Sequence, residues 1–97
     1  MVAGNYKAQG NIMGSVMETD ITYEVNGDVL TGTKLVWKEI VAVEEGIVEG
    51  NHFKYICHVT TLMGKLKVKV EGDVIGDEIT FTLKSAIGNS KFKGTRV

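Results

Sequence analysis

The chain has 97 residues, of which 43% are hydrophobic and 24% are charged, and its formal net charge is -1. This length fits a single domain spanning 1–97, and the small net charge gives no general attraction to nucleic acid or to acidic lipid. The single cysteine, Cys57, excludes an internal disulfide and a zinc site made of several cysteines.

Alternation of apolar and polar residues runs through most of the chain and predicts antiparallel β-strands. From Val16 to Val25, for example, Ile21 and Tyr23 share an apolar face while Asp20 lies on the opposite, polar face. Eight strands are expected, in chain order over residues 4–11, 16–25, 29–38, 40–48, 52–59, 65–70, 79–83 and 91–97. For the segment 85–89, a helical turn and an irregular loop are both open.

Short glycine-centred phrases separate these strands at three places. They are Val25-Asn26-Gly27-Asp28, Val48-Glu49-Gly50-Asn51 and Val74-Ile75-Gly76-Asp77. Glycine takes the positive backbone angles that close a tight hairpin, and the adjoining Asp or Asn tolerates the left-handed region. The chain is therefore expected to be an all-β protein built from successive hairpins.

Two features of the sequence favour a closed sheet. Proline is absent, so strand edges need another form of protection, and closure provides it. Met13-Gly14 and Met63-Gly64 each precede a long strand and a glycine turn, which indicates two similar four-stranded halves. Such halves form either an eight-stranded antiparallel up-and-down barrel or a flattened clam, lipocalin-like in outline. The bulky inward residues favour a mostly filled barrel with a shallow mouth.

Turn and strand motifs at 26–33, 76–82 and 92–97, together with the two Met-Gly turns, resemble a group of small bacterial all-β modules. Members of this group occur alone or as C-terminal appendages of hydrolases, among them amidohydrolase-like enzymes. The resemblance covers nearly the whole chain and implies an accessory module, with no established chemistry to transfer to it.

A looser similarity links the chain to lipocalin-like barrels. Their first strand carries Gly-x-Trp and their last strand carries an Arg that packs over the Trp. Gly4 and Tyr6 occupy the first of these places, with Tyr instead of Trp, and Arg96 occupies the second. If the first and last strands are neighbours, the similarity implies a cation-π contact between Arg96 and Tyr6.

Common catalytic motifs are missing from the sequence. There is no glycine-rich phosphate loop, no Gly-x-Ser-x-Gly and no His-Glu-x-x-His. His52 and His58 share a strand face but lie about 20 Å apart at the usual rise per residue, too far to share a metal. Cys57 falls on the apolar face, where a thiol behaves as a small hydrophobe. We therefore expect a protein that is not an enzyme and that uses no metal or cofactor.

No segment of the sequence predicts a membrane helix or a leader. The longest apolar run, Ile40 to Val43, is far shorter than the roughly 20 residues that a membrane helix needs. Residues 1–4 have no basic region followed by an apolar core. We expect no membrane partner, and either a cytoplasmic protein or a chain trimmed of its signal.

Charged residues form two opposed patterns. The alternating lysines of 65–69, with Lys54 and His58 on the neighbouring strand, predict a basic ribbon, while alternating acids over 18–24 predict an acidic stripe. Docking of one on the other in a second copy would give a homodimer. The alternative is that the lysines only protect a strand edge and keep the protein soluble. Nucleic acid is not an expected partner, because the chain lacks both net positive charge and a run of exposed aromatic residues.

Four residues are candidates for a ligand site. Tyr23 and Tyr55 fall on apolar faces, where a buried phenol needs a hydrogen-bond partner, and they can serve simply as core residues bonded to the backbone or to Thr19. Alternatively Thr19, Tyr23, Trp37 and Tyr55 line a small pocket for an apolar ligand. The sequence thus favours a noncatalytic β-barrel accessory or binding module for a small hydrophobic ligand. A protein-interaction domain and a hydrolase-associated enzyme domain are the alternatives.

Overall fold

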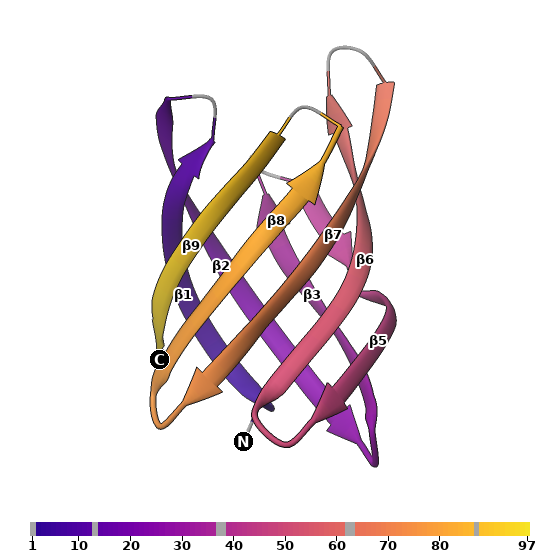
Figure 1. The fold of residues 1–97 in the computed structure, drawn as a ribbon, viewed down its shortest axis with the longest axis vertical. Helices are drawn as coiled ribbons and strands as arrows, with labels where there is room; N and C mark the ends of the chain where they lie inside the picture. The colour runs from indigo at the N-terminus through magenta and orange to yellow at the C-terminus, as the bar shows by residue number, and fades with distance from the viewer. Residues whose placement is uncertain (1, 13, 37–38, 62–63, 87) are drawn as a thin grey trace.

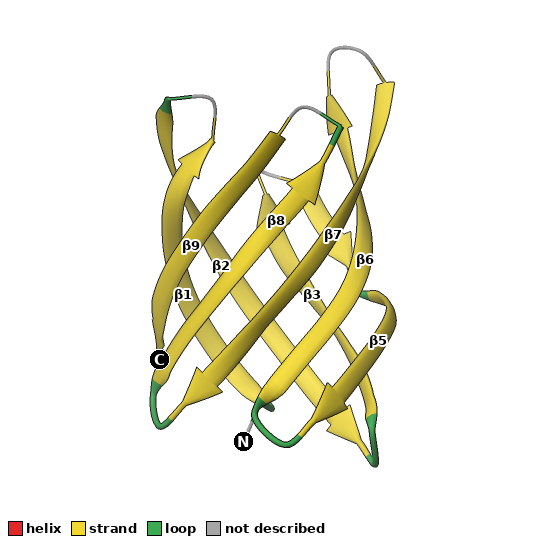
Figure 2. Cartoon of the chain, in the orientation of Figure 1, coloured by secondary structure: helices red, strands yellow, loops and turns green. Residues whose placement is uncertain are grey.

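A computed structural model describes residues 2–12, 14–36, 39–61, 64–86 and 88–97, and shows an all-β protein (Figures 1 and 2). No helix occurs among these described residues. The strands are β1 (Gly4–Ile12), β2 (Ser15–Asn26), β3 (Val29–Val36), β4 (Glu39–Ala42), β5 (Glu44–Glu49), β6 (His52–Thr61), β7 (Gly64–Ile75), β8 (Glu78–Ser85) and β9 (Gly88–Arg96).

The sheet closes into a barrel, and every pairing between its strands is antiparallel. Eight strands form the barrel in the cyclic order β1-β2-β3-β5-β6-β7-β8-β9, and β4 is an additional strand. Closure joins the first and last strands, with Tyr6 opposite Arg96 in the register of β1 and β9. The eight-stranded barrel predicted from the sequence is confirmed, and the flattened clam is not formed. Each barrel strand is paired on both sides, so closure supplies the protection of strand edges that the absence of proline had led us to expect.

The fourth predicted strand, 40–48, is interrupted, so its prediction as one continuous strand was wrong. The segment forms β4 and β5, both paired with β3: Val36 lies opposite Glu39 at one end, and Leu30 lies opposite Gly46 at the other. The two strands separate at Val43. Within β5, Glu45 has a φ of 52° and the register with β6 shifts between Glu44 and Ile47, as in a β-bulge. Because β2 occupies the other edge of β3, β4 and β5 lie end to end along one edge.

The segment 85–89 contains the end of one strand and the start of the next. Ser85 pairs with Gly88, and its hydroxyl donates a hydrogen bond to the Gly88 carbonyl over 3.2 Å. Both β8 and β9 therefore reach into this segment, and its described residues, 85–86 and 88–89, form no helical turn.

Inward and outward residues alternate as the sequence predicts. The inward side chains include the bulky residues expected there, namely Met17, Ile21, Tyr23, Phe53, Tyr55, Val68, Val70, Ile79 and Phe81, all buried, and Leu83, which is partly buried. The three glycine turns also form as predicted: φ is 66° at Gly27, 60° at Gly50 and 62° at Gly76. These three turns lie at the same end of the barrel as the two termini (Figure 1).

Aromatic rings fill this end of the barrel, which we call the filled end. The centroid of the Tyr23 ring lies 6.0 Å from that of Tyr6, 5.4 Å from that of Phe53 and 5.7 Å from that of Tyr55. Such tilted and edge-on contacts stabilise a core beyond its simple burial. Because the rings fill one end of the barrel interior, any cavity must lie toward the opposite end, which we call the open end.

Arg96 fastens the closure between the first and last strands. Its guanidinium lies 4.9 Å from the centre of the Tyr6 ring, which confirms the predicted cation-π contact. The same group donates a hydrogen bond of 2.6 Å to the Ala3 carbonyl and lies 3.4 Å from the Asp77 carboxylate. It therefore ties together the N-terminal segment, β1, β9 and the turn between β7 and β8.

Candidate functional site

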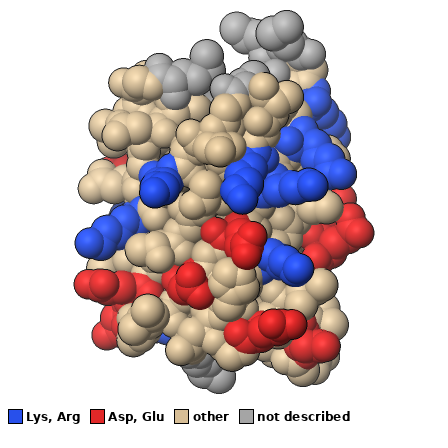
Figure 3. Space-filling model, in the orientation of Figure 1, with Lys and Arg blue, Asp and Glu red and all other residues tan. Residues whose placement is uncertain are grey.

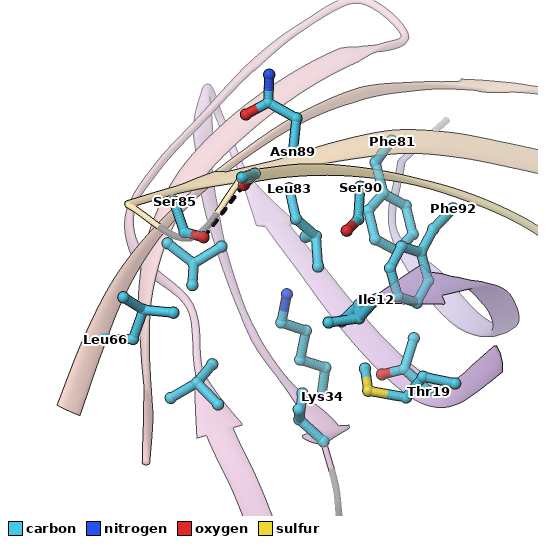
Figure 4. Close-up of a pocket in the computed structure, with 15 residues that line it drawn as sticks. Ile12, Thr19, Lys34, Leu66, Phe81, Leu83, Ser85, Asn89, Ser90 and Phe92 are labelled. Carbon is cyan, nitrogen blue, oxygen red and sulfur yellow. Dashed lines mark hydrogen bonds between the residues drawn. The ribbon is translucent and has the colours of Figure 1, made fainter. Parts of the chain in front are cut away.

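A cavity of about 270 Å³ opens at the end of the barrel opposite the aromatic cluster (Figure 4). Its walls come from β1, β2, β3, β6, β7, β8 and β9, and they reach as far as Phe81 and Phe92 in the middle of β8 and β9. The apolar part of the wall includes Met17, Val36, Val59, Val68, Leu83 and Phe92. Because inward positions alternate along each strand, these side chains converge from all sides and make an apolar cup.

Polar groups occupy the rim of the cavity. Ser85, Asn89 and Ser90 come from the adjoining ends of β8 and β9. In Figure 4 the Ser85 and Ser90 side chains lie on the same side of the strands as Leu83, whereas the Asn89 side chain points away from the cavity. A mostly apolar pocket with a few polar groups is the usual composition of a small-molecule site.

Lys34 is the one charged side chain that is buried among the described residues, with 4% of it exposed. It lies on β3 between the inward residues Leu30 and Val36, so its side chain enters the barrel, and it forms part of the cavity wall. Its Nζ lies 5.2 Å from the centre of the Tyr55 ring and 5.9 Å from that of Phe81. Figure 4 shows the amine directed into the cavity.

The surroundings of Lys34 lower the pKa of its amine below the ordinary value of 10.5, chiefly because burial disfavours the charged form. The titratable groups that face it are the phenol of Tyr55 and the thiol of Cys57, both on β6. Within the described ranges no carboxylate forms a salt bridge with it. Burial also raises the pKa of the Cys57 thiol, although the nearby amine acts in the opposite direction.

Two phenols of the aromatic cluster pair with each other below the cavity. The hydroxyl oxygens of Tyr23 and Tyr55 lie 2.6 Å apart and share a hydrogen bond. Burial raises the pKa of both phenols far above 10. They therefore remain neutral at any ordinary pH and act as a satisfied polar pair inside the core.

The four residues predicted to form a ligand site are only partly brought together. Thr19 lines the cavity, but its hydroxyl donates a hydrogen bond of 2.8 Å to the Leu35 carbonyl. Tyr23 and Tyr55 bond to each other beneath the cavity and do not line it. Trp37 lies outside the described residues.

Lys34 is the important residue that the sequence interpretation missed. A signal for it exists, because Lys34 has the same strand phase as Leu30 and Val36, which are apolar. A lysine at an inward position is unusual, since lysine is almost never fully buried without a partner. The third predicted strand is irregular in its alternation, and this irregularity obscured which of its residues point inward.

Lysines on the outer surface lie closer to the open end of the barrel than the acids on the same strands do. We call Lys65, Lys67, Lys69, Lys84 and Lys91 the lysine collar. Because β7 runs from the open end to the filled end, its lysines precede Glu71 and Asp73, and Figure 3 shows the same order of blue above red on this face. The collar covers β7, β8 and β9, whereas Glu18 and Asp20 lie near the open end on β2.

Groups that could hold a metal do not converge. Within the described residues there is no set of three or more His, Cys, Asp or Glu side chains placed to bind an ion. His52 bonds to Glu71 and Asp73 on the outer surface, and His58 bonds to Glu44. In the described part of the chain no helix has the length and apolar character needed to cross a membrane.

Known proteins were compared with the chain by sequence and by structure. No family model, no curated protein and no solved structure matches it. Its function therefore has to be inferred from the cavity and from the residues that line it.

Proposed function

We propose that the protein is a noncatalytic binding module that holds a small hydrophobic ligand in the open end of its barrel, in a lipocalin-like manner. The observation that supports this most strongly is the apolar cavity of about 270 Å³. Ligand pockets are typically roughly 300–1,000 Å³, so this volume suits a small molecule rather than a large lipid.

The division of the barrel into two parts supports the same proposal. The aromatic cluster around Tyr23 gives the filled end a well-packed core, while Val68, Leu83 and Phe92 at the other end line the cavity. Side chains that line a cavity have fewer protein atoms to contact than those of a packed core. A ligand that fills the cavity supplies such contacts, and binding then stabilises the fold by mass action.

An enzymatic role receives less support from the cavity. Acid-base or nucleophilic catalysis needs at least two ionisable groups that converge on one reacting atom. Lys34 is the one ionisable residue that lines this cavity within the described residues. The resemblance to small modules that are appended to hydrolases is compatible with an accessory role beside a catalytic domain. We therefore propose a binding role, not a catalytic one.

Native mass spectrometry of the isolated protein, followed by calorimetric titration with octanol, tests the proposal. We expect a co-purified small molecule or saturable binding of octanol. The variant Leu83→Trp should fill the cavity and abolish binding, while Thr80→Trp, on the outer face of the same strand, should bind as wild type does. Absence of saturable binding in the folded wild-type protein, or equal binding by both variants, contradicts the proposal.

A second candidate function is self-association through the outer face of β3, β4 and β5. Two apolar pairs are exposed there, Val29 opposite Ile47 and Leu35 opposite Ile40. Exposed apolar residues on neighbouring strands favour contact with another protein surface. The same native mass spectra test this candidate: a dimer that Ile40→Lys dissociates supports a homodimer through this face, and a monomer at all concentrations contradicts it.

A further inference from the structure

We propose that the ligand of the cavity is a medium-chain alkyl carboxylate whose acid group pairs with the amine of Lys34. This inference rests on the proposed function, and it adds the chemical class of the ligand and the residue that selects it. The alkyl chain would contact the apolar wall formed by residues such as Val68 and Leu83, and the carboxylate would lie at the amine.

The first support is the position of the amine. Lys34 is 4% exposed and belongs to the cavity wall, so its Nζ is available to a ligand in the cavity although bulk solvent scarcely reaches the side chain. Two aromatic faces, those of Tyr55 and Phe81, lie 5.2 and 5.9 Å from it. They stabilise a cation weakly, but they offer no negative charge to pair with one.

The second support is that the protein itself supplies no counter-ion. A buried ammonium is costly unless it is paired and hydrogen-bonded, and for this reason buried lysines normally have acidic partners. Among the described residues Lys34 makes no salt bridge; it interacts with the ring face of Tyr55 and with the thiol of Cys57, a hydrogen-bond partner whose pKa is raised by burial so that the neutral form is favoured. A carboxylate brought by a ligand would complete the pair and would form the stronger, charge-assisted type of hydrogen bond.

The protons balance in a simple way. If the amine is neutral before binding, the neutral acid can enter and transfer its carboxyl proton to the amine nitrogen, which leaves a carboxylate beside an ammonium. The same final state is reached when the carboxylate enters and the amine takes a proton from solvent. No oxidant, reductant or other reactant is needed, and no covalent bond between ligand and protein is formed.

The third support is the lysine collar. Lys84 and Lys91 belong to the collar and lie on β8 and β9, the strands that carry the polar rim of the cavity, and Lys67 lies on the neighbouring β7. Positive charge near a binding site raises the local concentration of an anionic ligand and the rate of its association. The chain as a whole carries a net charge of -1, so this attraction is local to one side of the open end.

Calorimetric titration of the full chain with octanoate, octanol and methyl octanoate tests the proposal. We expect octanoate to bind at least about tenfold more tightly than the two neutral compounds, a difference of about 1.4 kcal/mol. In Lys34→Met, which keeps the length and apolar stem of the side chain, we expect this preference to disappear while octanol still binds. Lys67→Met removes one outer charge of the same sign and should retain the preference.

A second measurement follows the amine directly. With ¹³C-labelled lysine, the Cε signal that is absent from Lys34→Met identifies Lys34, and its pH titration can be recorded with and without octanoate. We expect the titration midpoint to rise when octanoate is bound, because a carboxylate favours the ammonium form.

The outcomes separate this inference from the proposed function. Equal affinity for octanoate and octanol, an unchanged preference in Lys34→Met, or an unmoved titration midpoint would overturn the role of Lys34 and leave a neutral apolar site. Failure of all three compounds to bind the folded protein would overturn both proposals.

Discussion

The phenol oxygens of Tyr23 and Tyr55 lie 2.6 Å apart in the barrel core, where both side chains are buried. This pair lies at the boundary between the filled end of the barrel and the cavity. Tyr23 also contacts the rings of Tyr6 and Phe53 toward the filled end, while the Tyr55 ring lies 5.2 Å from the Lys34 amine at the cavity. The shared hydrogen bond satisfies two polar groups that have no access to water.

Replacing either phenol alone should destabilise the protein. Tyr23→Phe leaves the Tyr55 hydroxyl buried without its partner, and we expect the free energy of unfolding to fall by about 1–3 kcal/mol. In Tyr23→Phe/Tyr55→Phe no unpaired hydroxyl remains, so the double variant should lose less than the sum of the two single losses. Urea denaturation of the four proteins measures this, and strictly additive losses would contradict the buried pairing.

Removal of the Arg96 contacts should loosen the closure of the barrel. Arg96→Met loses the bond to the Ala3 carbonyl, the contact with the Tyr6 ring and the ion pair with Asp77. Because the Arg96 side chain is 26% exposed, we expect a moderate loss of about 1–3 kcal/mol in unfolding free energy. Lys93→Met, an exposed change on the same strand, should change the stability by less than about 0.5 kcal/mol. Equal effects of the two substitutions in urea denaturation would argue against the role given to Arg96.

His52 should make stability depend on pH near neutrality. Hydrogen bonds to Asp73 and Glu71 raise the pKa of His52 above its ordinary value of 6.5. The charged imidazole therefore stabilises the folded state fully below pH 6.5, and this contribution is lost as the pH rises through the higher folded-state pKa. The stability of the wild type relative to His52→Gln, measured by denaturation across this range, should fall with increasing pH. A relative stability that rises with pH would contradict the bonding observed for His52.

Lys34 should make stability depend on pH in the opposite direction to His52. Burial lowers its pKa, so the unfolded state binds more protons than the folded state between the lowered pKa and 10.5. The wild type should therefore gain stability relative to Lys34→Met as the pH rises through this interval, and Lys34→Met should be the more stable protein at pH 7. Thermal unfolding of both proteins over this range checks the sign. A constant difference between them would mean that the amine is not desolvated in the folded state.

The barrel could be predicted from the sequence because its determinants are local. Strict alternation in segments such as 16–25 orients the side chains, and glycines at positions 27, 50 and 76 fix the hairpins. The irregularity within β5 was not predictable in this way, because it includes a positive φ at Glu45, a residue type that rarely adopts one. Glu44-Glu45-Gly46 interrupts the apolar pattern of 40–48, but it does not show that the positive φ falls on Glu45 and not on the glycine beside it.

The cavity was harder to predict than the fold. Alternation shows which residues point inward, but it does not show how far the inward side chains of opposite strands reach. Tyr23 and Tyr55 were suggested for the site because they are aromatic and inward, and in the structure they fill the space below it. Lys34 was overlooked because the alternation of its strand is irregular and a lysine is normally expected to point outward.

Chemical-shift mapping with octanol tests the central claim most directly, because it reports the place of binding. With methyl-labelled Val, Leu and Met, saturable shifts should appear at methyl groups that line the cavity, including those of Met17, Val68 and Leu83. Val74, buried near the turn between β7 and β8, should not respond, and neither should Val29 and Val16 on the outer surface. Absence of saturable shifts, or shifts centred on the outer face of β3, would contradict binding inside the barrel.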